Sequence, residues 1–177
     1  MAHIDLPDNL AGIIGLFAKH PETAGVLCEL AQTLLRSESS LTEGERELIA
    51  AYVSSRNKCR YCMSTHGAVA KYFLKDDGEI LNSVFDDYQN APVSGKMKAL
   101  LNIASKVQLG GKNVTDNDVE AARKEGADDK AIHDTVLIAA AFCMFNRYVD
   151  GLGTWQPDDM SIYEDRGTML AEKGYVR

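Results

Sequence analysis

Residues 47–66, with the sequence ELIAAYVSSRNKCRYCMSTH, contain four side chains that could do chemistry together. Cys59 and Cys62 are three positions apart, and His66 follows Cys62 by four. On a helix, at about 100° per residue, these three side chains fall within an arc of about 60° and share one face. Glu47 stands twelve positions before Cys59. A thiol pair with an imidazole and a carboxylate is compatible with redox chemistry or with metal binding.

The position of the two cysteines favours redox chemistry. Both lie at the start of a helix predicted over residues 60–74, where unpaired backbone amides and the helix dipole favour negative charge. A thiol in this place loses its proton more readily, and the thiolate is the reactive form. Lys58 and Arg60 add positive charge nearby, whereas Tyr61 is expected to point the opposite way. This setting is typical of a redox-active dithiol.

The same residues fit a metal site less well. A structural zinc site usually takes four ligands, and the other two cysteines, Cys28 and Cys143, lie far away in the sequence. Both are predicted to be buried core thiols, because they lie on apolar helical faces. Haem attachment needs a histidine directly after the second cysteine, where this chain has Met63. The remaining alternative is that two ordinary thiols happen to lie at a helix start.

The presence of a glutamate at position 47 has two possible explanations. It directly precedes the apolar run LIAAYV, so its helix is expected to be buried on most sides. Burial raises the pKa of a carboxyl group and would suit Glu47 to proton transfer. Acidic residues are also favoured at helix starts for reasons of the helix dipole alone.

The elements that must position these residues are predicted to be helices. Pro21 suits a first helical turn, and Thr42 with Glu45 matches a capping box. Helical patterns cover roughly residues 21–37, 42–57, 60–74, 78–90, 94–109, 116–125 and 128–150, and residues 155–177 are expected to form a terminal helix or arm. No strand pattern or convincing repeat interrupts them. We therefore expect one all-α domain over residues 1–177, with its redox core at residues 42–75.

Composition narrows the possible partners and the compartment. The 177-residue chain has a formal net charge of -7 and no Lys/Arg cluster, so nucleic acid and anionic membrane surfaces are unlikely partners. The apolar runs at residues 10–18 and 135–145 are too short to span a bilayer. The first follows Asp5 and Asp8 rather than basic residues, which is atypical of a signal peptide. We expect a cytoplasmic protein with reduced thiols.

Glu47, Cys59, Cys62 and His66 together resemble the alkylhydroperoxidase D (AhpD)-like family of the carboxymuconolactone decarboxylase superfamily. The family pattern is Glu, eleven intervening residues, Cys-x-x-Cys, three intervening residues and His, and this chain has those separations. The segments CRYCMSTHGAVA and FNRYVDGLGT (residues 145–154) look like the peroxidase-related branch. The resemblance implies an all-helical fold that assembles into homotrimers or hexamers.

The resemblance also implies a cysteine peroxidase mechanism. Cys62 would attack the O–O bond of a hydroperoxide and become a sulfenic acid. Cys59, nearer the helix start and expected to be more exposed, would resolve it by forming the 59–62 disulfide. Glu47 and His66 would form the proton relay. An external dithiol or thiol reductant protein would then reduce the disulfide, and no haem, metal or other cofactor is required.

One position departs from the family pattern. The best-known AhpD proteins have a histidine within the cysteine pair, where this chain has Tyr61. With an unperturbed pKa of about 10, tyrosine shuttles protons less easily near neutral pH. This departure affects any additional relay step through this position and the reductant system of those proteins, but it does not affect the other four residues of the pattern.

Two other classes of function are compatible with this sequence. A thiol–disulfide oxidoreductase or redox sensor would need the same dithiol. A carboxymuconolactone decarboxylase-like enzyme, or a non-catalytic oligomeric binder, would leave the cysteines incidental.

Near the end of the long helix, Asn146 and Asp150 are one turn apart. They are interpreted as capping residues with a surface ion pair for Arg147, or as a contact between subunits.

Overall fold

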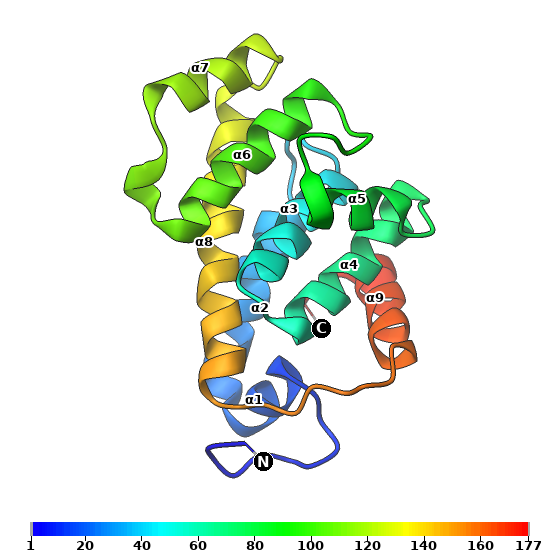
Figure 1. Cartoon of the computed structure of the whole chain (residues 1–177). Helices are drawn as coiled ribbons and strands as arrows, with labels where there is room; N and C mark the ends of the chain where they lie inside the picture. Colours follow the sequence, from blue (N-terminus) through cyan, green and yellow to red (C-terminus); the bar gives the residue numbers. More distant parts are fainter. Residues whose placement is uncertain (1, 177) are drawn as a thin grey trace.

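The computed structural model describes residues 2–176, and over this range the regular structure is entirely helical (Figure 1). The helices are α1 (Ile13–Lys19), α2 (Pro21–Arg36), α3 (Glu43–Arg56), α4 (Arg60–Leu74), α5 (Glu79–Asp87), α6 (Gly95–Leu109), the 3₁₀ turn η1 (Gly111–Asn113), α7 (Asp116–Lys124), α8 (Asp129–Gly151) and α9 (Ser161–Lys173). The all-α prediction is therefore confirmed. None of these helices has the length and apolar character to cross a bilayer.

Helix α3 forms the centre of the core. It packs against α4, α6 and α8, and residues 46–54 are buried without interruption. A helix that is apolar on nearly all sides is stable only when other helices surround it. Thr42 and Glu45 form the predicted capping box at its start, with the Glu45 amide donating to Thr42 Oγ1 at 3.2 Å. The core around α3 thus holds the helix that carries Glu47.

A tight turn joins α3 to α4. The Lys58 amide donates to the Ser55 carbonyl and the Cys59 amide to the Ser54 carbonyl, both at 3.0 Å. These two bonds, with Lys58 in the left-handed region at φ 59°, make a Schellman motif, which usually has glycine at that position. The turn places Cys59 at the N-cap of α4 and Cys62 in its first turn.

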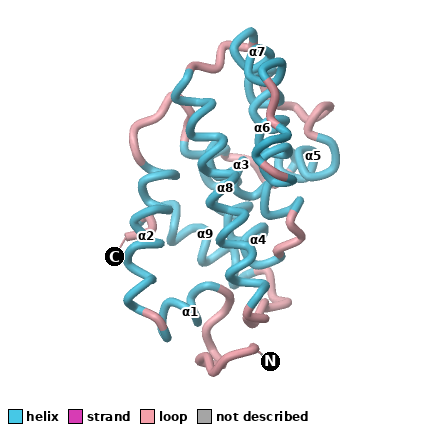
Figure 2. The backbone as a smooth tube through the Cα atoms, turned by 90° about the vertical axis from the view of Figure 1, so that its left-hand side faces the viewer, coloured by secondary structure: helices cyan, strands magenta, loops and turns pink. Residues whose placement is uncertain are grey.

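Two helices near the chain ends cover the start of α4. Helix α1 was not predicted, because a short run that is apolar throughout has no helical period to recognise. Its N-cap residue Gly12, at φ 54°, lies against the Tyr61 ring, where an added Cβ would come within 2.4 Å of ring atoms. The terminal segment, predicted as a helix or arm, forms α9, which packs along α4. Figure 2 shows α1 at the end of the molecule opposite α7.

Candidate functional site

The two cysteines of the pair differ in their surroundings. Cys59 has 0% exposed surface and Cys62 has 4%, and both are free thiols. The prediction that Cys59 is the more exposed cysteine is therefore wrong. The reason is that Val149 and Tyr163 pack over the N-cap position that was expected to face solvent. The neighbouring Cys62 side chain and burial raise the pKa of the Cys59 thiol.

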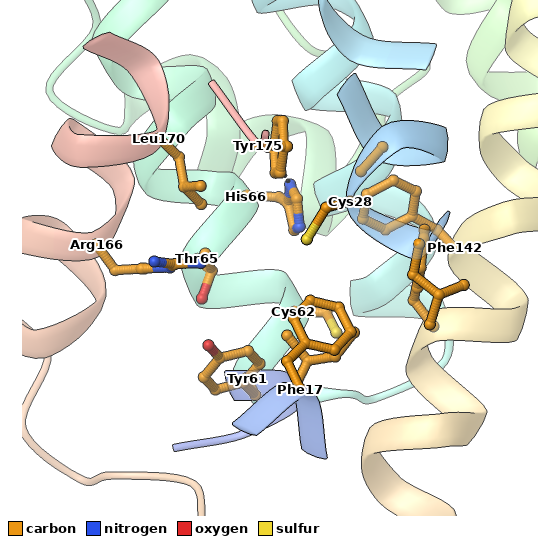
Figure 3. Close-up of a pocket in the computed structure, with 14 residues that line it drawn as sticks. Phe17, Cys28, Tyr61, Cys62, Thr65, His66, Phe142, Arg166, Leu170 and Tyr175 are labelled. Carbon is orange, nitrogen blue, oxygen red and sulfur yellow. Dashed lines mark hydrogen bonds between the residues drawn. The ribbon is translucent and has the colours of Figure 1, made fainter. Parts of the chain in front are cut away.

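Cys62 lines a cavity of about 60 Å³ together with His66, one helical turn further along α4 (Figure 3). This volume is enough for a few water molecules or one small organic group. Most of its wall is apolar and comes from four helices, with Ile13, Phe17, Leu27, Phe142, Phe145 and Leu170. The cavity therefore brings a thiol and an imidazole to the surface of a small, largely apolar chamber.

Two residues lie in this cavity that were expected elsewhere. Cys28 on α2 was predicted to be a core thiol, but it is only partly buried and lines the cavity. Figure 3 shows its sulfur pointing toward the His66 ring. Tyr61 was predicted to point away from Cys62, yet it lines the same cavity, because α1 and α9 enclose this end of α4. Burial raises the pKa of Tyr61 to about 12, so its hydroxyl stays neutral near neutral pH.

Cys143, the other cysteine predicted to be in the core, is also only partly buried. It lies on α8, and the Asn57 side-chain amide approaches its sulfur at 3.5 Å. Cys143 is not among the residues that line the cavity.

Glu47 is fully buried and has three polar partners. One oxygen, Oε2, is 2.8 Å from His66 Nδ1. The other, Oε1, accepts hydrogen bonds from Arg36 Nη1 at 2.7 Å and from the Tyr175 hydroxyl at 2.6 Å. A carboxylate held by three donors is stabilised in its charged form even without access to water.

The net effect of these contacts contradicts the first of the two explanations for Glu47, in which burial raises its pKa. Burial alone would raise the pKa of the carboxyl, which was the expectation. The charge and hydrogen bond of His66, the guanidinium of Arg36 and the hydroxyl of Tyr175 outweigh burial and lower the pKa of Glu47 below its usual value. Glu47 is therefore an anion that orients its partners rather than a carboxylic acid poised to give up a proton.

The contact with Glu47 fixes the tautomer of His66. A carboxylate can only accept hydrogen bonds, so in the neutral ring the proton lies on Nδ1 and the lone pair on Nε2. Figure 3 shows the second ring nitrogen pointing into the cavity, on the side of Cys28. The Phe142 ring meets the imidazole edge to face, with centroids 4.5 Å apart. His66 therefore presents a base to the cavity from a fixed ring orientation.

Sequence reasoning missed two residues of this site. Arg36 ends α2, and Tyr175 follows α9 by two positions. Both are brought to Glu47 by the packing of other segments against α3, since Arg36 lies on α2 and Tyr175 is 128 positions from Glu47. The only local signal was Gly174, which suits the turn that ends α9.

Of the two roles expected for the polar residues near the end of α8, capping with a surface ion pair is wrong, and a contact between subunits stays a prediction. Asn146 is buried, accepts a hydrogen bond from Asn57 Nδ2 at 2.8 Å and donates one to Ser54 Oγ at 3.0 Å. It therefore fixes the α3–α4 turn rather than capping α8. Arg147 donates to the Cys143 carbonyl of its own helix, and Asp150 accepts from Gln156 Nε2.

No group of three or more His, Cys, Asp or Glu side chains within residues 2–176 is arranged to hold a metal ion. The polar contacts around Glu47 are instead all made by side chains of the protein.

Comparison with known proteins agrees with this architecture. Residues 21–84, which contain Glu47, Cys59, Cys62 and His66, match the model of the carboxymuconolactone decarboxylase family. A search of curated proteins finds no match.

Solved structures provide the other comparisons. One, a protein of Ralstonia eutropha JMP134 described as an alkylhydroperoxidase AhpD core and an uncharacterized peroxidase-related protein, has 27% identity and a TM-score of 0.79, with 89% of this chain and 81% of that one covered. An uncharacterized peroxidase-related protein of Silicibacter sp. TM1040 has 25% identity and a TM-score of 0.80, with 94% and 95% covered. A protein of unknown function from Agrobacterium tumefaciens shares the fold, with 20% identity, a TM-score of 0.68, and 84% and 99% covered.

Proposed function

We propose that this chain, whose residues 21–84 match the carboxymuconolactone decarboxylase family model and whose fold is similar to that of peroxidase-related proteins, is an AhpD-like thiol-dependent peroxidase that reduces small hydroperoxides. The observation that carries the proposal is the contact of 2.8 Å between Glu47 and His66, beside the cavity that Cys62 and His66 line together. Nucleophilic catalysis by a cysteine needs such a base within reach and a group that orients it.

In the first step the thiol proton of Cys62 passes to Nε2 of His66. The Cys62 thiolate attacks the terminal oxygen of the hydroperoxide, and the O–O bond breaks. Cys62 becomes a sulfenic acid, and the departing alkoxide takes the proton from His66 and leaves as an alcohol. The anionic Glu47 stabilises the imidazolium that forms between these two transfers.

Cys59 completes the oxidation. Its sulfur attacks the sulfur of the Cys62 sulfenic acid, the 59–62 disulfide forms, and water leaves with the Cys59 proton. The buried, protonated state of Cys59 suits a resolving thiol, which must wait until Cys62 has reacted. An external dithiol reduces the disulfide and is itself oxidised to a disulfide. Because Cys59 is covered, we expect reduction to need a local opening of α1 or α9.

The cavity also favours one class of hydroperoxide. Its volume of about 60 Å³ and its mainly apolar wall suit a compact alkyl group beside the reacting oxygens. We therefore expect small alkyl hydroperoxides to react faster than bulky ones, because a larger group would require the surrounding helices to move.

The test is to add one equivalent of tert-butyl hydroperoxide to the reduced protein and to map the cysteines by mass spectrometry. The expected product is the 59–62 disulfide, formed much faster than a free thiol is oxidised. Cys62→Ser should abolish the reaction, and Cys59→Ser should leave a sulfenic acid on Cys62. Cys143→Ser, which changes a thiol outside the cavity, is the matched control. Oxidation no faster than that of a free thiol would refute the proposal.

The alternative of a thiol–disulfide oxidoreductase is less compatible with the site. Such an enzyme must present a cysteine to the disulfide of another molecule as its main reaction, whereas the peroxidase needs the local opening of α1 or α9 only for the reduction step, because a small hydroperoxide reacts inside the cavity. A decarboxylase or a non-catalytic binder would not need the contact between Glu47 and His66 beside the cavity that Cys62 lines.

A further inference from the structure

The end of the chain enters the candidate site. After α9, the backbone turns at Gly174, whose φ of 72° lies in the left-handed region. A Cβ at this position would come within 2.5 Å of Gln32 Oε1. The same oxygen accepts a hydrogen bond from the Tyr175 amide at 2.7 Å. The turn and this bond together hold the tail against α2 and direct the Tyr175 side chain inward.

The Tyr175 side chain contacts both members of the Glu47–His66 pair. Its hydroxyl donates to Glu47 Oε1 at 2.6 Å and lies 3.2 Å from His66 Nδ1. Its ring is stacked on the imidazole, with centroids 5.9 Å apart and an interplanar angle of 11° (Figure 3). The Arg36 guanidinium lies 5.0 Å from the centroid of the same ring.

We propose that Tyr175 is a positioning residue of the proton relay, which holds the Glu47 carboxylate and the His66 ring in the arrangement that leaves Nε2 free to accept the proton of Cys62. The hydroxyl fixes one carboxylate oxygen while His66 bonds the other, so the carboxylate cannot rotate away. The ring lies nearly parallel to the imidazole, with its hydroxyl beside the Nδ1 edge. The part that this role plays in catalysis rests on the proposed function. The expected effect of Tyr175 on the reactivity of the Cys62 thiol does not rest on it.

Tyr175 itself does not exchange protons in this arrangement. Burial and the adjacent Glu47 carboxylate raise the pKa of Tyr175 well above 10, so it remains a neutral donor. The charged and titratable groups that face Glu47 are Arg36 from α2, His66 from α4 and Tyr175 from the tail. On α3 itself, the nearest cation is Arg46.

Tyr175→Phe tests this role because it keeps the ring and removes only the hydroxyl. The readouts are the rate of Cys62 alkylation by iodoacetamide, resolved by mass spectrometry, and the rate of its oxidation by tert-butyl hydroperoxide, both between pH 4 and 9. At neutral pH we expect both rates to fall about tenfold, part of the 10²–10⁴-fold contribution of a well-positioned base. Since Glu47 loses a donor that lowers its pKa, the acid limb of each profile should move to higher pH.

Tyr88→Phe is the matched control. Its hydroxyl donates to Asn102 Oδ1 at 3.2 Å, and Tyr88 does not line the cavity, so both rates should stay unchanged. Gly174→Ala gives an independent test, because it keeps the Tyr175 hydroxyl in the chain but displaces the tail and so moves the hydroxyl away from Glu47; it should lower both rates in the same way.

The outcomes separate the two proposals. If Tyr175→Phe is folded and both profiles match those of the unchanged protein, the positioning role is wrong. A lower melting temperature with an unchanged acid limb would also overturn it, since that result describes a purely structural residue. Should Tyr175→Phe not fold, Gly174→Ala decides. Another outcome is that Tyr175→Phe slows the alkylation of Cys62 and moves its acid limb to higher pH in a protein that does not reduce hydroperoxides. In that case the proposed function fails and the positioning role stands.

Discussion

At the scale of single residues, the site depends on a carboxylate that the protein keeps charged without water. Glu47 has no exposed surface, and its three partners come from α2, α4 and the C-terminal tail. A buried anion is stable only when hydrogen bonds and opposite charge replace its hydration. This makes Glu47 a residue on which both folding and the proposed chemistry depend.

Replacing Glu47 with glutamine should affect both properties. Glu47→Gln keeps the shape of the side chain but leaves the nearly buried Arg36 without its anion, so we expect a loss of roughly 3 kcal/mol in the free energy of unfolding. The rate of Cys62 oxidation should fall about 100-fold, because the imidazolium is no longer stabilised. Urea unfolding and stopped-flow oxidation measure the two effects.

Glu43→Gln is the control for this variant. Glu43 approaches Arg36 Nε at 3.8 Å, but its side chain is 41% exposed. Because the Glu43 carboxylate is open to water and its contact with Arg36 is long, we expect this pair to contribute at most about 1 kcal/mol, and Glu43 does not contact His66. Equal effects of the two substitutions would show that charge near Arg36, rather than the buried contact, is what matters.

At the scale of the elements, the α3–α4 turn sets the position of the cysteine pair. Two backbone bonds close the turn, and Asn146 on α8 holds its Asn57 side chain, which also accepts a bond from Gln108 on α6. The helix that carries Cys62 and His66 therefore starts at a point fixed by three other helices. This anchoring keeps the first turn of α4 in place while α1 and α9 cover it.

Lys58 is a strained residue in this turn, and its replacement tests the geometry. A residue with a Cβ in the left-handed region costs about 1–2 kcal/mol, whereas glycine adopts it freely. After allowance for the greater freedom of glycine in the unfolded chain, Lys58→Gly should stabilise the protein by about 0.5–1 kcal/mol. The measurement is urea unfolding.

The matched change is Lys98→Gly, inside α6, where glycine should cost about 1 kcal/mol instead. If the two substitutions had the same sign, the turn would not have the conformation described here.

At the scale of the whole molecule, ionised buried carboxylates make stability depend on pH. Burial opposes the charge of both Glu47 and Asp134, but their donors lower both pKa values below normal. For Asp134 these donors are Lys130, Ser39 and His133. A carboxyl group whose pKa is lower in the folded state stabilises the protein fully above its unfolded pKa, of about 4.

We therefore expect the free energy of unfolding to be nearly constant between pH 6 and 7 and to decline below about pH 4, as these groups take up protons. Urea unfolding between pH 3 and 7 checks this. Glu47→Gln should lose less stability over the same acid range, because one of the titrating groups is gone. A steeper decline in that variant would contradict the role of Glu47.

Assembly into trimers or hexamers stays a prediction.

Local signals in the sequence predict most of the helices and the register of the candidate residues. Helical period, Pro21 and the capping box at Thr42 are local signals, and seven of the predicted helices match observed ones closely. The shared face of Cys62 and His66 follows from spacing on one helix, so it too could be predicted. The spacing of Glu47 gave the resemblance, but not the state of its carboxyl group.

The surroundings of these residues depend on how the helices pack. Burial of Cys59, the entry of Cys28 and Tyr61 into the cavity, and the three partners of Glu47 all result from contacts between different helices or between a helix and the tail. The pKa of a buried group depends on the balance between lost hydration and nearby donors, and those donors have no signature in the local sequence. For this reason the direction of the pKa shift of Glu47 was predicted wrongly, although its position was recognised.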